Sequence, residues 1–393
     1  MKFMRKHYLL VLTLGVFSIL NIEMGIIGVL SQVSSHYGIV LTTAGLLVSM
    51  FALAIAISGP VLPMLMSRFE RKKIMILVLS IFTVCNVIGA FAVSFPVLLA
   101  TRVIPAFFHP VYVSFALAAA SDSVEDQKDA PKATAKVMVG VSAGMVLGAP
   151  IAGLIVSWST LRMGMLFFAA ANLISLIATI LFVPNFTTAQ RSSLRNQLQA
   201  LKEKKLWLAL IGVIFLNGSI FGVYSYVSAY LQEVVSLPAQ IISIVLLIYG
   251  LMNIVGNTIA GRELSARPGR FISLLPPAIG VLYVLMLFLG ASAIPAIVLV
   301  LAWGVLAGTV ANSIQYWVTE AAPGVPEFAN GLYLTAANLG VSAATPFCGL
   351  FITGMGTRSV PMGGIILAVC SAACVFLKVW VVDKRSTSAF THV

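Results

Sequence analysis

Long apolar runs, separated by short polar or basic segments, follow one another along almost the whole sequence. The runs lack the period of two that marks barrel strands and stay apolar for about 20 residues, the length of α-helix that crosses ~30 Å of hydrocarbon. We therefore expect an all-α polytopic membrane protein. The pattern predicts twelve transmembrane helices, over residues 8–30, 42–66, 74–93, 96–119, 134–157, 163–184, 207–230, 239–261, 271–291, 295–319, 330–355 and 361–382.

The composition excludes a soluble globular domain. Hydrophobic residues make up 60% of the 393 residues and charged residues only 9%, whereas soluble domains carry about 25% charged residues. A chain this apolar cannot cover itself with polar surface in water, so a lipid bilayer is its expected surrounding.

The positive charge of the chain is distributed unevenly along the predicted topology. The formal net charge is +12, and with the N-terminus inside, nearly all of the 24 Lys and Arg residues fall in cytoplasmic segments. The outer side keeps Arg162 and Arg358, and Arg102 lies within a span. This asymmetry follows the positive-inside rule, so we expect a bacterial cytoplasmic membrane protein with both termini in the cytoplasm and no nucleic-acid partner.

The longest polar interruption, from Asn185 to Lys205, divides the chain near its middle. We expect an N-terminal six-helix bundle over 1–190, a cytoplasmic linker over 191–206 and a C-terminal six-helix bundle over 207–393. A shift of 196 residues brings span five onto span eleven, with Gly144 on Gly340, Pro150 on Pro346 and Gly153 on Gly349. Parallel six-helix repeats of this kind are typical of secondary transporters.

Three ionisable side chains lie deep within predicted spans, away from the span ends: Glu23 in span one, and Arg102 and His109 in span four. A charge at the bilayer centre costs at least ~3 kcal/mol, so such residues indicate a function or a partner. The helical rise places Glu23 and Arg102 at nearly the same depth, where a carboxylate and a guanidinium can meet. His109 follows Arg102 by seven residues and returns to the same helix face, and Pro105 and Pro110 are expected to kink the span.

We predict that Glu23, Arg102 and His109 couple transport to protons. Apolar surroundings favour the protonated carboxyl group and a nearby guanidinium favours the carboxylate, so a change in hydration would make Glu23 take up or release a proton. A titrating imidazole at His109 can relay that proton. A purely structural Glu–Arg bridge, and a neutral His109 bonded to a neighbouring helix, are the alternatives.

The predicted spans of the C-terminal half contain no buried acid or base, and their polarity comes from amides and phenols. Pairs of these residues recur at spacings that place them on one helix face. We expect them to bind a neutral or amphiphilic solute with several hydroxyl or amide groups, although each could instead make an interhelical hydrogen bond. These candidate binding residues are Asn217, Tyr224, Tyr249, Asn253 and Asn338.

The loop after span two resembles a signature of the major facilitator superfamily. Its segment Pro63 to Lys72 is similar to Gly-x-Leu-x-Asp-Arg-x-Gly-Arg-Lys, with matches at Leu65, Arg68, Arg71 and Lys72. Ser67 stands where the family has Asp, so a charge relay through that Asp does not carry over to this chain. Span four has the Arg of the family's Arg-x-x-Gln-Gly motif at Arg102, with Pro105 and Ala106 in place of Gln and Gly.

Span five resembles the antiporter signature of that family, Gly-x-x-x-Gly-x-x-x-Gly-x-Pro-x-x-Gly. The matching residues are Gly140, Gly144, Gly148, Pro150 and Gly153. Their small-x-x-x-small spacing allows close helix packing, so we expect a hinge that shapes the gate rather than direct chemistry, with ligand contact as the alternative. Together with Glu23 and His109, these residues resemble the twelve-span drug/proton antiporter branch, which holds sugar-efflux, purine-efflux and chloramphenicol-efflux proteins.

The resemblance implies a proton-driven exporter of a small organic solute that works by alternating access. We find no phosphate loop, dinucleotide-binding glycine pattern, nucleophile elbow or metal cluster in the sequence, so we expect no cofactor, no enzymatic activity and a proton gradient as the energy source. The expected partners are the solute, protons and the lipid bilayer, with the chain as a monomer. A proton-independent facilitator or importer is the alternative, and a non-transporting membrane sensor is a third reading.

Overall fold

The computed structural model describes residues 2–66, 68–123, 130–184, 201–322 and 326–377. Within these ranges the regular structure is helical, and twelve helical stretches are long and apolar enough to cross a bilayer. The predicted fold class, an all-α polytopic membrane protein with twelve spans, is therefore confirmed. The chain divides into two compact units, and most of the predicted linker (191–200) lies outside the described residues.

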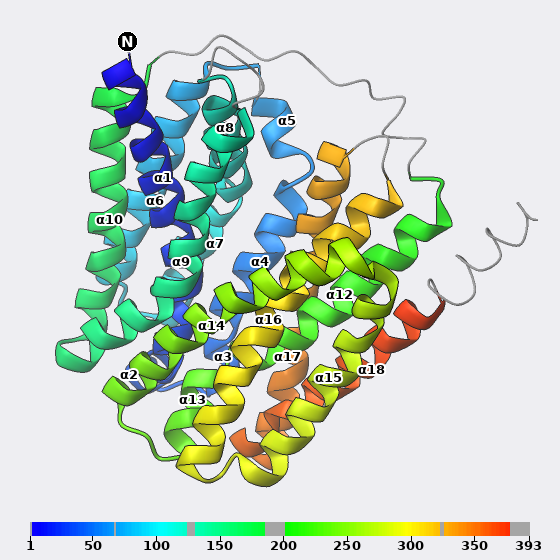
Figure 1. Cartoon of the computed structure of the whole chain (residues 1–393). Helices are drawn as coiled ribbons and strands as arrows, with labels where there is room; N and C mark the ends of the chain where they lie inside the picture. The colour runs from blue at the N-terminus through cyan, green and yellow to red at the C-terminus, as the bar shows by residue number, and fades with distance from the viewer. Residues whose placement is uncertain (1, 67, 124–129, 185–200, 323–325, 378–393) are drawn as a thin grey trace, which may run out of the picture. The chain divides into compact units, whose positions relative to one another are not determined.

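The first unit contains residues 1–190 together with the start of α14, residues 239–247. Its helices carry the first six spans (Figure 1). They are α1 (Lys2–Gly25), η1 (Ile26–Val29), α2 (Leu30–Tyr37), α3 (Leu41–Ala44), α4 (Leu46–Ser58), α5 (Leu62–Met66), α6 (Arg71–Ala90), α7 (Phe95–Ala106), α8 (His109–Ser121), α9 (Ala130–Trp158) and α10 (Leu161–Phe182).

The second unit contains residues 191–238 and 248–393. Its described helices carry the last six spans, apart from the start of α14. They are α12 (Lys204–Tyr224), α13 (Val227–Glu233), α14 (Ala239–Ala266), α15 (Pro268–Leu289), α16 (Ala293–Ala321), α17 (Pro326–Met355), η3 (Thr357–Ser359) and α18 (Val360–Phe376).

The two units repeat one packing scheme. In the first unit α1 packs against α9 and α10, and α6 packs against α10. In the second unit α12 packs against α17 and α18, and α15 packs against α18. Spans one, three, five and six thus make the same contacts as spans seven, nine, eleven and twelve, which is the arrangement that the sequence repeat indicates.

Several predicted spans differ from the helices in their boundaries or continuity. Span one runs to Tyr37 rather than residue 30 and is divided by the 3-10 turn η1. Span two ends at Ser58 rather than residue 66, because Gly59 and Pro60 follow: glycine has low helix propensity, and proline lacks the N–H that would bond the preceding turn. Span four is interrupted between α7 and α8, where Pro105 and Pro110 flank the break.

Large apolar side chains on the outward faces of the helices remain exposed. Phe288, Leu350 and Leu181 are each about two-thirds or more exposed. Runs of such residues are unfavourable on a soluble protein and are expected where lipid covers the surface.

Candidate functional site

Two interruptions of spanning helices place the ionisable residues of the first unit. Glu23 lies in the last turn of α1, directly before the 3-10 turn η1, and His109 is the first residue of α8. The break before His109 follows from Pro105 inside α7 and from Pro110 in the first turn of α8. Helix breaks expose backbone groups inside the unit, so polar side chains collect beside them.

Glu23 and His109 form the closest charged contact of this region. His109 Nε2 lies 3.1 Å from Glu23 Oε2, and the two side chains are 11% and 18% exposed. The imidazole is not directed at the carboxylate, because neither of its ring nitrogens makes a hydrogen bond. The two groups are therefore in contact without a well-aligned hydrogen bond.

Arg102 lies beside this pair but bonds to the backbone of α1. Its Nη2 donates to the carbonyl oxygen of Ile22 at 2.9 Å, and its guanidinium carbon lies 5.2 Å from the centroid of the Phe51 ring. The side chain is buried, and Nε and Nη1 have no hydrogen-bond partner. The N–H groups on these two nitrogens therefore have no acceptor at this depth.

The expected ion pair between Glu23 and Arg102 is not formed in this structure. Arg102 reaches the level of Glu23, as the depth argument predicts, since Ile22 is its chain neighbour. Among the described residues, however, Glu23 makes its ion contact with His109 rather than with Arg102. The guanidinium instead donates to a carbonyl oxygen in the last turn of α1 and lies over the face of Phe51. Carbonyls in the last turn of a helix have no N–H partner within the helix, so they are free to accept.

Two further residues belong to this cluster that sequence reasoning missed. Phe51 on α4 contacts both Arg102 and His109, since the His109 ring packs edge-on against it with a centroid separation of 6.2 Å. Asn21 is fully buried on α1, and neither its amide nitrogen nor its amide oxygen has a partner. Asn21 could have been found from the sequence, because a polar amide stands out in an apolar span. Phe51 could not, because phenylalanine is common in such spans.

The glycines of the antiporter signature face α1 at backbone distance. A Cβ on Gly144 would lie 2.6 Å from Leu20 Cβ, and one on Gly148 would lie 3.0 Å from the carbonyl oxygen of Asn21. One on Gly140 would collide with the carbonyl of Thr13, whereas one on Gly153 would lie 2.7 Å from Ser243 Oγ of α14 and 3.5 Å from the carbonyl oxygen of Gly28 in η1. Pro150 lies within α9 between these contacts. The stripe thus fixes α9 against the helix that carries Glu23.

Arg71 of the signature after span two joins two helix ends. Its Nη1 donates to Asp122 Oδ2 at 2.6 Å, which links the start of α6 to the end of α8, and the Arg71 side chain is buried. Arg68 is exposed and Lys72 is half-buried, and neither has an ion-pair partner among the described residues. Ser67 lies outside the described residues.

Tyr224 and Tyr249 meet in the second unit. Their rings stack at 4.7 Å with an interplanar angle of 19°, and both lie edge-on to Trp303. Tyr283 contacts the same indole and donates its hydroxyl hydrogen to the carbonyl of Ser219. Trp303 and Tyr283 were not among the predicted residues, because a lone aromatic in an apolar run has no distinguishing pattern.

The three predicted asparagines make their hydrogen bonds elsewhere and not with the Tyr224 and Tyr249 rings. Asn217 donates to the carbonyl of Ala337, and Asn338 donates to the carbonyl of Leu334 on its own helix. Asn253 accepts from Asn257, one turn further along α14. Asn217 thus serves helix packing, whereas Asn253 and Asn338 are half-buried and keep part of their polar groups free.

A polar cavity of about 610 Å³ opens at the end of the second unit where α14 and α16 finish. Its wall combines amides and hydroxyls without a charged group, including Asn312, Gln315 and Asn330. Gln315 donates to Asn330 at 3.1 Å, so both side chains are held toward each other. Within the described part of the chain, no group of three His, Cys, Asp or Glu side chains could hold a metal ion.

Comparison with known proteins gives one family. The sequence matches the model of the Major Facilitator Superfamily over residues 12–345. An uncharacterized MFS-type transporter of Bacillus subtilis (strain 168), YtbD, is 29% identical and covers 91% of this chain and 92% of its own length. A chloramphenicol resistance protein of Streptomyces lividans is 27% identical, with 88% and 90% covered.

Solved structures agree with this fold. A bacterial homologue of the human lysosomal transporter Spinster, crystallised in an inward-facing and unoccupied conformation, superposes with a TM-score of 0.76 over 96% of this chain and 97% of that chain. The two sequences are 17% identical.

Proposed function

Because the chain belongs to the Major Facilitator Superfamily and is therefore a membrane transporter, we propose that it is a proton-coupled exporter of a small organic solute. The proposal rests on the contact between Glu23 and His109, with Arg102 beside it, inside the first unit. Ionisable groups inside a bundle are expensive, and proton relays are among the functions for which they are retained.

The chemistry of the cluster suits the uptake and release of one proton. Glu23 is the proposed proton carrier, and His109, at 3.1 Å, is the proposed relay because its ring nitrogens have no competing hydrogen bonds. The free N–H groups of Arg102 stabilise the carboxylate when the proton leaves. Alternating access would expose Glu23 to one side of the membrane and then to the other.

The second unit supports an organic solute rather than an inorganic ion. Tyr224 and Tyr249 are buried as a stacked pair and would contribute two rings and two hydroxyl groups to a solute site when alternating access exposes them, and the half-buried Asn253 and Asn338 offer amides. Such surfaces recognise uncharged or amphiphilic molecules. The chloramphenicol resistance protein among the relatives makes chloramphenicol the first solute to test.

The glycine stripe of α9 and the distribution of basic residues bear on the gate and on the membrane location of the protein. The glycine stripe of α9 allows α1 and α9 to move as one packed pair, so a change at Glu23 would be passed to the gate. The asymmetry of Lys and Arg supports a cytoplasmic membrane location with both termini inside. We propose a monomer, because one chain supplies both six-helix units.

A facilitator is the competing function. In that case Glu23, His109 and Arg102 would brace α1 against α7 and α8, as the Arg102 bond to Ile22 already does. Solute would then move down its own gradient without proton movement.

Purified protein in liposomes with a trapped pH dye distinguishes these functions. Chloramphenicol and a panel of sugars and nucleosides would be added to the wild type, to Glu23→Gln and to Glu263→Gln, an exposed control at the end of α14. We expect solute-dependent proton flux in the wild type and in the control but not in Glu23→Gln. Solute movement without proton flux in the wild type would establish the facilitator instead.

A further inference from the structure

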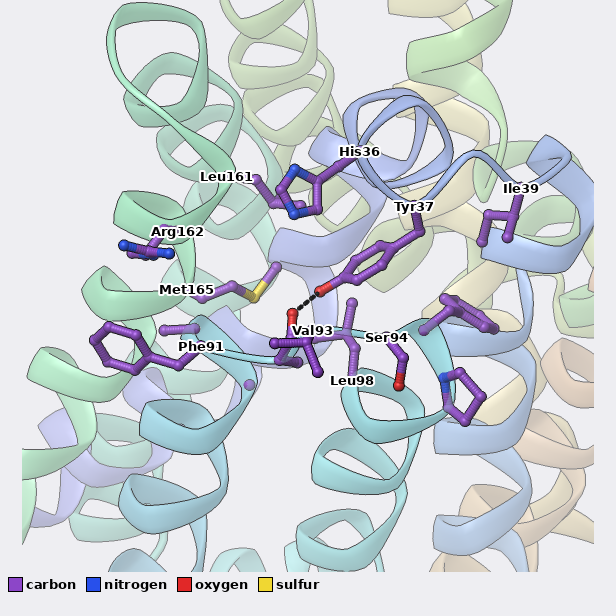
Figure 2. A pocket seen from close by; sticks show the side chains of 15 residues that line it. His36, Tyr37, Ile39, Phe91, Val93, Ser94, Leu98, Leu161, Arg162 and Met165 are labelled. Atoms are coloured by element: carbon purple, nitrogen blue, oxygen red, sulfur yellow. Dashed lines mark hydrogen bonds between the residues drawn. The ribbon is translucent and has the colours of Figure 1, made fainter.

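A cavity of about 620 Å³ lies in the first unit, at the opposite end of α6 from the basic loop. Three segments line it: the end of α2, residues 89–98 around the start of α7, and the start of α10. Figure 2 shows His36, Tyr37 and Met165 directed toward the space beside Val93. Glu23, Arg102 and His109 are not part of its wall, so it is separate from the proposed proton site.

The wall of this cavity is held by specific contacts. The Tyr37 hydroxyl donates to the carbonyl of Ala92 at 3.0 Å (Figure 2). The Tyr37 ring also packs edge-on against Phe95, with a centroid separation of 6.3 Å. The end of α2 is therefore fixed to the loop before α7, which keeps the cavity open between them.

The cavity has an apolar floor and a cationic rim. Leu98 and Met165 in the floor are almost completely buried, whereas His36 and Arg162 at the rim are exposed. The Arg162 guanidinium carbon lies 5.1 Å from the centroid of the Phe91 ring, which holds the charge beside the opening.

No carboxylate neutralises this rim. None of the residues that line the cavity is Asp or Glu, and Arg162 has no ion-pair partner in the described part of the chain. A guanidinium that rests on an aromatic ring beside a cavity is arranged to receive an anion, because its planar N–H groups match the oxygens of a carboxylate or phosphate.

We propose that this cavity binds an amphiphilic anion. Its phosphate or carboxylate would lie against Arg162, with His36 as a second donor, and its apolar part would cover Leu98 and Met165. The volume falls within the range of about 300–1,000 Å³ that is usual for small-molecule sites.

Two sources can supply such an anion. One is an anionic phospholipid, because Phe91 and Val93 are exposed in the connection between two spans, where lipid headgroups are expected. The other is a soluble organic acid or phosphate with an apolar tail. The shared chemistry is the anionic group on Arg162.

The test measures binding to the purified full-length protein in uncharged detergent by thermal shift and native mass spectrometry. Probes are phosphatidylglycerol for the lipid source and octyl phosphate and octanoate for the soluble source. The variants are Arg162→Gln and His36→Gln, both at exposed positions. Arg358→Gln is the matched control, because this arginine donates to the carbonyl of Leu287 in the second unit.

We expect at least one probe to bind, with an affinity at least about tenfold weaker in Arg162→Gln, weaker in His36→Gln and unchanged in Arg358→Gln. Binding of phosphatidylglycerol but not of the short anions identifies lipid as the source, and the reverse result identifies a soluble ligand. The proposal is overturned if no probe binds the wild type, or if both cavity variants bind as the wild type does.

Discussion

At the scale of single residues, two of the three ionisable side chains deep in the first unit pack against one aromatic ring. Phe51 lies under Arg102 and edge-on to His109, and Arg102 is fixed further by the carbonyl of Ile22. Cation–π contacts are worth about 0.5–2 kcal/mol, more when the cation is desolvated. The ring therefore packs against both Arg102 and His109 beside Glu23.

This arrangement predicts a specific effect of Phe51→Leu. Loss of the ring removes packing and the contact with Arg102, so we expect destabilisation of about 2–4 kcal/mol and reduced proton-coupled transport. Phe82→Leu is the matched control, because Phe82 is equally buried on α6 and has no cation over its ring in the described part of the chain.

Thermal unfolding and proton flux measured on both variants separate packing from positioning. Phe82→Leu should lose stability by packing alone and keep proton flux per folded molecule. Equal proton flux in the two variants would show that Phe51 does not position the cations.

The candidate residues were predictable from the sequence only where they contrast with their surroundings. Glu23, Arg102 and His109 stand out because charge is rare in an apolar span, whereas Phe51 and Trp303 do not. The choice of His109 over Arg102 as the partner of Glu23 depends on how the two helix breaks turn their side chains. Spacing along the chain carries no information about that rotation.

At the scale of elements, the hydropathy pattern was sufficient to predict the twelve spans but not to predict where their helices are interrupted. Prolines marked the break between α7 and α8 in advance. The 3-10 turn after α1 has no proline, and its glycines resemble the many packing glycines of the chain. Most span boundaries were therefore predictable to a few residues, apart from the ends of spans one and two, whereas local geometry depended on tertiary packing.

The packing of α1 against α9 predicts that Gly144 tolerates no side chain. A Cβ there would lie 2.6 Å from Leu20 Cβ and 2.9 Å from the carbonyl oxygen of Phe17, so the helices would have to separate. We expect Gly144→Ala to destabilise the protein by about 1–3 kcal/mol. Gly280→Ala is the control, because nothing lies within 4 Å of its added Cβ and alanine favours the helix.

Thermal melting in detergent checks this prediction. Gly280→Ala should melt at or above the temperature of the wild type, and Gly144→Ala should melt below it. If both variants melt together, α1 and α9 do not pack at backbone distance.

The ion pair between Arg71 and Asp122 predicts a measurable coupling between α6 and α8. Arg71 is nearly buried while Asp122 is half exposed, so solvent screening limits the coupling to about 1 kcal/mol. A double-mutant cycle with Arg71→Gln and Asp122→Asn should show this coupling. The same cycle on Glu70 and the exposed Lys73 should give about 0–0.5 kcal/mol. An equal coupling energy for both pairs would contradict the role of Arg71 and Asp122 in linking α6 to α8.

At the scale of the whole molecule, the two units share a packing scheme but differ in chemistry. The first holds acid, imidazole and guanidinium groups, and the second holds stacked phenols and amides. On this division rests our proposal that the first unit exchanges protons and the second recognises an organic solute. The central claim is therefore that Glu23 links solute movement to a proton gradient.

Two modes of transport, compared in the same proteoliposomes, test that claim most directly. An acidic interior drives protons outward and should drive solute inward against its own gradient, whereas exchange of labelled for unlabelled solute needs no gradient. We predict that the wild type performs both, and that Glu23→Gln retains exchange but loses accumulation. Accumulation by Glu23→Gln equal to that of the wild type would contradict the account.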